Sequence, residues 1–149
     1  MISEMALGKL ILTRAHLQGI EQAARDASPR EACGMLIGRR EGAGWRVLRV
    51  EPSSNVAPAD QADRFEVDPV LLLRLHKELR GSALAMVGVY HSHPNGVCAP
   101  SATDLAHSWQ ADMIWLISAL SAGVIETRGF VRDQQGFTPV PLEILESAP

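Results

Sequence analysis

The sequence has no long apolar run, few cysteines and no strong excess of either charge. A membrane-spanning helix needs at least about 18 consecutive apolar residues, and no window approaches that length. Two cysteines, Cys33 and Cys98, cannot build a disulfide framework. The opening residues MISEMALGKLIL lack the basic stretch and cleavage site of a signal peptide. These absences predict a soluble protein in the reducing cytoplasm, without a membrane partner.

Length and charge narrow the class further. The chain has 149 residues, of which 46% are hydrophobic and 21% are charged, and its formal net charge at pH 7 is −3. These values predict one globular domain over residues 1–149. A nearly balanced charge creates no field that would attract nucleic acid, so no nucleic-acid partner is expected. No apolar surface stripe stands out, and we expect a monomer or a weak homodimer.

Hydrophobic runs bounded by turn residues predict eight strands. The run ALAMVGVY at residues 83–90 is the most apolar and is expected at the centre of the sheet. The polar segment 53–63 is expected to be an exposed loop. The predicted strands cover residues 9–12, 31–38, 45–50, 64–67, 83–90, 113–119, 124–131 and 140–145.

Three helices are predicted between these strands. Thr13 is a good N-cap for a helix over residues 14–27. Asp68, followed by proline, begins a second helix over residues 69–80, and Ser101 begins a third. Hairpins thus alternate with helical crossovers. This order predicts an α/β (α+β mixed) fold, with a single curved mixed β-sheet flanked by helices.

The most informative stretch is HSHPNGVCAPSATD, residues 91–104. Side chains in a strand alternate, so His91 and His93 share one face while Ser92 points to the other. Pro94 cannot continue the ladder, which places both imidazoles at the end of the strand. Asp104 can return from the next helix as a third ligand. Two histidines, one aspartate and a water form the open type of zinc site found in enzymes.

Each of these signals has a simpler explanation when it is taken alone. His-x-His occurs in many proteins without a metal. Ser101-x-x-Asp104 is a good helix-capping pattern. Glu31 by itself reads as a surface acid at the entrance of a strand. The functional interpretation therefore rests on the combination of these residues.

The combination closely resembles the signature of the JAMM (MPN-plus) zinc metallopeptidases. That signature is an upstream Glu followed by H-[ST]-H-P-x6-S-x-x-D, and every position is filled here, beginning at Glu31. The likeness extends to the strand EACGMLIG and to the segment Asn55–Pro69, so it covers most of the chain. It implies a cytidine-deaminase-like arrangement of sheet and helices, and a chain of the short prokaryotic type.

The resemblance also implies a role for each residue. His91, His93 and Asp104 would bind Zn2+, and we expect the metal to prevail over the helix cap in the competition for Asp104. Glu31 would be the catalytic base, taking a proton from water and passing it to the leaving amine. Ser101 would donate a hydrogen bond to the oxyanion.

The substrate implied by the resemblance is a small ubiquitin-like protein. The chain is too compact for the insertions with which relatives grip two ubiquitins, and it looks more like processors of small ubiquitin-like sulfur carriers. The predicted reaction is hydrolysis of the amide or isopeptide bond after a C-terminal Gly-Gly tail. A non-catalytic MPN-type binding module and a cell-wall or phage-tail peptidase remain as alternatives. The missing P-C-x-x-C ligand signature argues against a zinc deaminase or another small-molecule amidohydrolase.

Three further residues have open roles. Cys98 lies between the predicted ligands, as a fourth ligand or, as we favour, as an ordinary loop residue. His107 follows Asp104 by three positions, either beside the site or on a solvated helix face. Trp109 is expected to pack in the core, with a place beside the substrate as the alternative.

Overall fold

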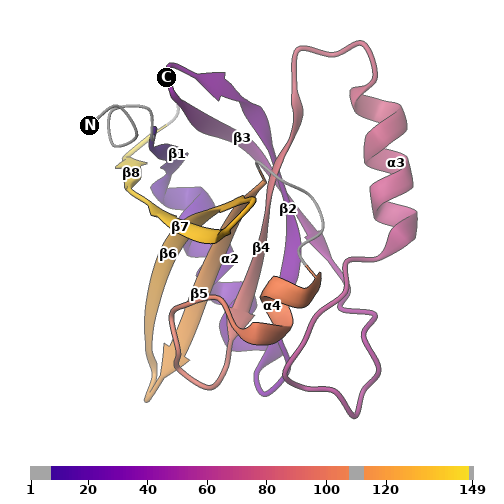
Figure 1. The fold of residues 1–149 in the computed structure, drawn as a ribbon, viewed down its shortest axis with the longest axis vertical. Coiled ribbons are helices and arrows are strands. Elements are labelled where there is room, and N and C mark those ends of the chain that lie inside the picture. Colours follow the sequence, from indigo (N-terminus) through magenta and orange to yellow (C-terminus); the bar gives the residue numbers. More distant parts are fainter. Residues whose placement is uncertain (1–7, 108–112, 148–149) are drawn as a thin grey trace.

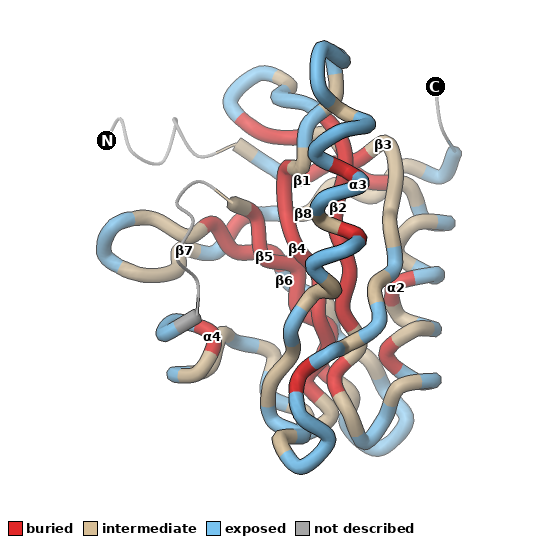
Figure 2. The backbone as a smooth tube through the Cα atoms, turned by 90° about the vertical axis from the view of Figure 1, so that its right-hand side faces the viewer, coloured by how far each residue is buried: buried red, intermediate tan, exposed pale blue. Residues whose placement is uncertain are grey.

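The structure is a computed structural model that describes residues 8–107 and 113–147. Within these residues, eight strands form one sheet, and three helices lie against it (Figure 1). Helix α2 covers one face of the sheet, and α4 lies on the opposite side (Figure 2). The elements are β1 (Leu10–Thr13), α2 (Arg14–Ala27), β2 (Cys33–Glu41), β3 (Gly44–Ser53), α3 (Pro69–Leu79), β4 (Ala85–His93), α4 (Ala102–His107), β5 (Ile114–Ser121), β6 (Val124–Asp133), β7 (Gly136–Val140) and β8 (Leu142–Leu145).

The sheet is mixed, which confirms the predicted fold class. Its strand order is β7-β6-β5-β4-β2-β3-β1-β8. The pairs β4–β5, β1–β3 and β1–β8 are parallel, and the other neighbours are antiparallel. Strand β4 lies near the middle, between β2 and β5, as its apolar sequence predicted. Helix α4 belongs to the crossover between the parallel strands β4 and β5, so it returns over one face of the sheet.

The predicted helix starts are confirmed by their caps. Thr13 Oγ1 accepts a hydrogen bond from the His16 N–H at 3.1 Å, and α2 then runs over the predicted residues. Asp68 accepts from the Val70 N–H at 2.9 Å at the start of α3. Helix α2 buries Ile20 against the sheet. Within the described parts of the chain, no helix is long and apolar enough to cross a membrane.

Side chains alternate between the two faces of the sheet, so the buried hydrophobic residues form two clusters. Leu36 and Tyr90 belong to the cluster that includes Ile20 of α2. Their strand neighbours, such as Val89, belong to a second cluster with Leu71 and Leu75 of α3. Helix α3 therefore packs on the face that also carries His91 and His93, since these two share the parity of Val89.

The structure corrects two of the predicted strands. Residues 64–67 form no strand, and Val67 makes only an isolated bridge with Asn55. Residues 140–145 are not one strand, because β7 ends at Val140 and β8 begins at Leu142. Pro141 between them has no N–H for a ladder, while its carbonyl accepts from the Leu10 N–H at 2.9 Å.

The split at Pro141 shows how strongly the sheet curls. Strand β7 is at one edge of the sheet and β8 is at the other, yet a single residue joins them. The two edges must therefore lie close together, as Figure 1 shows. The predicted curvature of the sheet is confirmed, and it approaches closure.

Candidate active site

His91 and His93 lie at the end of β4, and their side chains point to the same face of the sheet. Both are buried, with 0% and 4% of their surface exposed. Their Nε2 atoms are 3.0 Å apart. Two ring nitrogens at this distance are directed at a common point.

Asp104 brings a carboxylate to the same point from α4. Its Oδ2 lies 3.3 Å from His91 Nε2 and 3.1 Å from His93 Nε2. The same oxygen accepts a hydrogen bond from the Ser101 N–H, and Ser101 Oγ accepts one from the Asp104 N–H, each at 2.9 Å. The oxygen that accepts from the cap is thus the one that lies at the two imidazoles, and the expected outcome of a competition between metal and cap stays a prediction. The cap fixes Asp104 in the position where it meets the two imidazoles.

The three donor atoms fit a zinc ion. Tetrahedral zinc with bonds of about 2.0–2.1 Å separates neighbouring ligand atoms by about 3.3 Å. The separations here are 3.0, 3.1 and 3.3 Å. Two imidazole nitrogens and one carboxylate oxygen are also ordinary zinc ligands, and three protein ligands leave a fourth position free. His91, His93 and Asp104 are hereafter called the ligand trio.

Glu31 lies just before β2, beside the ligand trio. Potential ligand atoms of Glu31, His91 and His93 all lie within 4.8 Å of one another. This group overlaps with the trio but is wider, so Asp104 rather than Glu31 is the better third ligand. Glu31 is 4% exposed, and its Oε1 has no hydrogen-bond partner among the described residues. Such a carboxylate stands at the distance at which a water can bridge it to the trio.

The pKa of the Glu31 carboxyl is raised to about 7, mainly by burial. The charge of His93 opposes this rise, whereas the charges of Asp104 and Asp63 add to it. A carboxyl group with a pKa near neutrality can both take and return a proton. The position and the acidity of Glu31 thus both suit proton transfer.

Burial and hydrogen bonds set the protonation states of the ligand trio. Burial lowers the pKa of His91, which keeps the ring neutral. Burial also disfavours the charged forms of His93 and Asp104. In both cases hydrogen bonds outweigh it: the contacts with Asp104 and the Val97 carbonyl raise the pKa of His93, and the two histidines lower the pKa of Asp104. Asp104 is therefore an anion, as a zinc ligand must be.

The two histidines are oriented by different means. His93 donates its Nδ1 proton to the Val97 carbonyl at 2.7 Å, which leaves the Nε2 lone pair free for a metal. His91 Nδ1 has no such partner in the described part of the chain. Phe65 instead stacks on the His91 ring, with 4.3 Å between centroids and 19° between planes, and Trp115 meets its edge. Sequence reasoning identified neither Val97 nor Phe65 as a support.

Two further residues that sequence reasoning missed hold the backbone beside Glu31. Ser92 Oγ accepts from the Ala32 N–H at 2.8 Å, and the Ser92 N–H donates to the Ala32 carbonyl at 3.0 Å. Asn55 Nδ2 donates to the Glu31 carbonyl at 2.9 Å. A polar residue buried between two predicted ligands was the available signal for Ser92, and the segment RFEVDP that follows Asn55 was the signal for that region.

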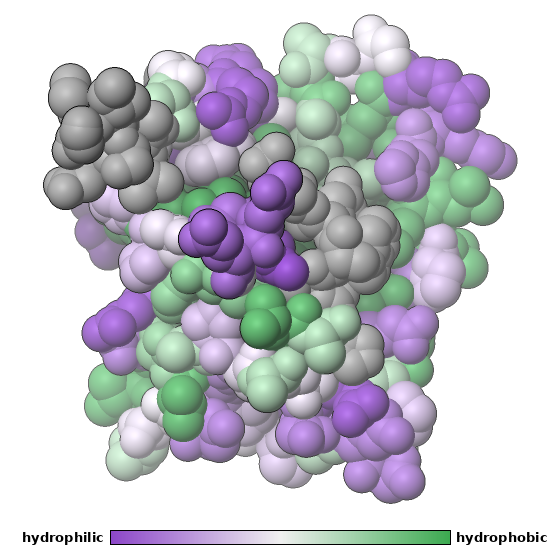
Figure 3. Space-filling model, in the orientation of Figure 1, coloured by the Kyte–Doolittle hydropathy of each residue, from purple (hydrophilic) through white to green (hydrophobic). Residues whose placement is uncertain are grey.

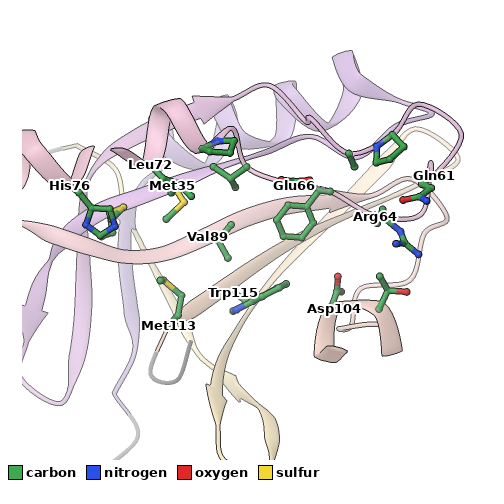
Figure 4. A pocket seen from close by; sticks show the side chains of 17 residues that line it. Met35, Gln61, Arg64, Glu66, Leu72, His76, Val89, Asp104, Met113 and Trp115 are labelled. Carbon is green, nitrogen blue, oxygen red and sulfur yellow. The ribbon is translucent and has the colours of Figure 1, made fainter. Parts of the chain in front are cut away.

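A groove of about 500 Å³ extends from the site between α3, the loop before it and the sheet. Asp104 lies at one end of the groove and His76 at the other, with Arg64 and Gln61 near Asp104 (Figure 4). The middle of the groove is apolar, lined among others by Met35, Leu72, Val89, Met113 and Trp115. Its shape admits an extended chain with apolar side chains.

Apolar surface also gathers on the side of the molecule formed by α3 (Figure 3). Val70 and Leu73 of that helix are 73% and 57% exposed. Arg74 on the same helix is about half exposed as well. The outer side of α3 therefore exposes apolar side chains, beside an Arg74 that lies within ion-pair distance of Glu51 and Glu78.

The remaining candidates lie apart from the ligand trio or outside the description. The Cys98 thiol contacts the carbonyls of Ile117 and Glu126, at 3.6 and 3.3 Å, on β5 and β6. It does not belong to the group of potential ligands around the two histidines. The side chain of His107 and the whole of Trp109 lie outside the described residues.

Comparison with known proteins identifies the family of this chain. Residues 13–132 match the model of the prokaryotic homologs of the JAB domain. The match covers most of the chain, and the chain therefore belongs to this family.

Relatives in the family carry names that describe proteases. A Thermus thermophilus protein named as a probable TtuB-protein conjugate cleaving protease is 37% identical over 108 residues, covering 72% of this chain and 64% of that protein. The chain thus matches slightly less than two thirds of this relative's length. A Pyrococcus furiosus protein named desampylase is 31% identical, covering 77% of each chain.

Solved structures agree with the fold. A Desulfitobacterium hafniense protein matches with a TM-score of 0.82 and 30% identity, covering 93% of this chain and 94% of the other. A JAB1/MPN domain protein from Archaeoglobus fulgidus matches with a TM-score of 0.59 and 21% identity, covering 93% and 99%. The second likeness concerns the fold alone. Together they agree with the MPN-type architecture that the motif implied.

Proposed function

We propose that this protein is a zinc-dependent peptidase that hydrolyses the amide or isopeptide bond after the C-terminal Gly-Gly tail of a small ubiquitin-like protein of the sulfur-carrier type. One observation carries the proposal. Three ligand atoms lie within 3.3 Å of one another beside a buried carboxylate oxygen that has no partner in the described structure. The names of the relatives support the substrate class, since one describes the cleavage of protein conjugates.

Each residue has a defined part in the reaction. His91, His93 and Asp104 would hold the zinc, which when bound acidifies water and polarises the scissile carbonyl. Glu31 takes a proton from the attacking water on Oε1 and returns it to the leaving amine. Ser101 Oγ accepts a hydrogen bond from the Asp104 N–H, and its own proton is available for the oxyanion.

The groove supports an extended tail as the ligand. Two glycines next to the cleaved bond have no side chains, so their backbone can come close to the ligand trio. Apolar residues further back in the tail would lie along Val89 and Leu72. The exposed apolar side chains of α3, Val70 and Leu73, would then face the folded body of the substrate.

The test uses the purified protein, zinc and two substrates. One is a ubiquitin-like protein extended beyond its Gly-Gly, and the other is the same protein joined to a lysine side chain. We expect intact masses to show cleavage after the second glycine, with one zinc per chain by elemental analysis. Unchanged masses of both substrates, with zinc bound at one per chain, would disprove the proposed function.

A further inference from the structure

The peptide group that joins Glu31 to Ala32 is held by side chains at both ends. Its carbonyl, on Glu31, accepts from Asn55 Nδ2 at 2.9 Å. Its N–H, on Ala32, donates to Ser92 Oγ at 2.8 Å. Strand β2 begins only at Cys33, so this peptide group lies just outside the strand. Two side chains thus supply the constraints that a strand would otherwise give.

Fixing this peptide plane restricts where the side chain of Glu31 can lie. The Cα of Glu31 belongs to the plane, so holding the plane holds the atom from which Cβ leaves the backbone. The carboxylate makes no hydrogen bond through Oε1 that would hold it from its far end. Its place beside the imidazoles therefore depends on the backbone to which it is attached.

Asn55 connects the same peptide group to the wall of the groove. Its Nδ2 also donates to the Arg64 carbonyl at 3.2 Å. Its Oδ1 accepts from the N–H groups of Ala57 and Glu66, both at 3.0 Å. Arg64, Phe65 and Glu66 line the groove, and Phe65 stacks on His91. One amide side chain thus joins the backbone of Glu31 to the segment that lines the groove and supports His91.

We propose that Asn55 and Ser92 are positioning residues that clamp the Glu31–Ala32 peptide group, and that Asn55 thereby couples the base to the substrate groove. The inference rests on the proposed function for the role of Glu31. Neither residue needs to touch the substrate. Both act through Glu31, and a displacement of about 1 Å at a reacting group can cost roughly 100-fold in rate.

Ser53 provides a matched control. Its Oγ accepts from the Asp68 N–H at 2.9 Å and donates to the Ser54 carbonyl at 2.7 Å. Like Asn55, it ties together the two ends of the loop before α3. It makes no hydrogen bond to Glu31. A role that is limited to closing this loop would make Ser53→Ala and Asn55→Ala equivalent.

The kinetic test compares kcat in two backgrounds. We expect Asn55→Ala and Ser92→Ala each to lower kcat by roughly 10- to 100-fold with one zinc retained per chain, while Ser92→Thr keeps the hydroxyl and restores most of the rate. Ser53→Ala should stay within about twofold of the parent. In a Glu31→Gln background, Asn55→Ala should add no more than about a twofold loss, because a positioning residue has nothing left to position. Equal losses in both backgrounds would overturn the proposal.

Hydrogen exchange tests the coupling without any turnover. In Asn55→Ala, the Ala32 amide and the amides of residues 64–67 should lose protection together. In Ser53→Ala, the Asp68 amide should lose protection, while the Ala32 amide should keep it, because Ser53 contacts Cys33 and not the Glu31–Ala32 peptide group. An unchanged Ala32 amide in Asn55→Ala would refute the clamp even if the enzyme proved active. Coupled loss in a protein that cleaves nothing would sustain the clamp and refute only the proposed function.

Discussion

Polar groups are buried on both faces of the sheet near the end of β4. They have hydrogen-bond partners on one face, whereas two of them lack partners among the described residues on the other. On the α2 side, Ser118 Oγ and Thr127 Oγ1 share a hydrogen bond at 2.8 Å, and Thr127 donates to Glu21 of α2 at 2.8 Å. Ser92 stands beside Ser118 in the ladder and has its own partner in Ala32. We call Ser118, Thr127 and Glu21 the hydroxyl seam. Every hydroxyl in it has a partner.

The ligand trio and Glu31 lie on the opposite face of the sheet. There, Glu31 Oε1 and His91 Nδ1 are buried without hydrogen-bond partners in the described structure. An unpartnered buried polar group costs about 1–3 kcal/mol. The comparison shows that burial alone does not identify a reactive site. What distinguishes the trio is the convergence of donors on one point, with Glu31 left free beside them.

Removing a ligand should give the largest effect. We expect His91→Ala to lose zinc and, with it, all measurable hydrolysis, because two remaining donors do not hold the ion in an open site. Elemental analysis and the cleavage assay measure the two losses. The control is His76→Ala at the far end of the groove, which should retain zinc. Full zinc content in His91→Ala would contradict the assignment.

Neutralising Glu31 separates binding from chemistry. Glu31→Gln keeps the shape of the side chain but removes the base, so turnover should fall by roughly 10²- to 10⁴-fold, the usual contribution of proton transfer. Zinc content should stay at one per chain. Glu126→Gln, an exposed carboxylate on β6, should leave turnover unchanged. Parent-like turnover in Glu31→Gln would remove Glu31 from the mechanism.

A smaller effect is expected where His91 is supported by stacking alone. Phe65→Ala exposes the His91 ring to water and removes the surface that orients it. We expect zinc affinity to fall by about tenfold, the lower end of the range for residues that support a ligand. Competition with a zinc chelator measures the change, and Phe65→Tyr should keep the stacked ring and the affinity. A parent-like affinity in Phe65→Ala would mean that the strand and the edge contact with Trp115 suffice to orient His91.

The smallest effect should come from the hydroxyl seam. Ser118→Ala removes one hydrogen bond on the α2 face, so the free energy of unfolding should fall by about 1 kcal/mol. Zinc content and kcat should not change, because Ser118 faces away from the ligand trio. Denaturant unfolding and the cleavage assay measure the two outcomes. A tenfold loss of kcat would show that Ser118 contributes to catalysis.

The sequence was sufficient for the elements whose signals are local. Helix α2 begins and ends as predicted because Thr13 caps it and Ser28-Pro29 follows it. The convergence of His91, His93 and Asp104, with Glu31 beside them, was expected from the motif. The motif identifies positions, however, and the single Asp104 oxygen shared by cap and trio became visible only in the structure.

Long-range contacts explain what could not be predicted. Residues 64–67 read as a strand, but Asn55 takes the Arg64 carbonyl and the Glu66 N–H. No pattern in the sequence shows that one amide side chain will occupy these backbone groups. The stacking of Phe65 on His91 likewise joins residues far apart in the chain, which periodicity cannot reveal.

The pairing of β1 with β8 also has a consequence for how the protein is made. Leu10 is in register with Leu142, and Thr13 with Leu145. The edge of β1 that faces β8 therefore stays unpaired until β8 is in place. Such distant pairings form slowly and late. A ribosome must therefore release residues 142–145 before the sheet can close, and until then a nascent chain carries β1 with its outer hydrogen-bonding groups unpaired.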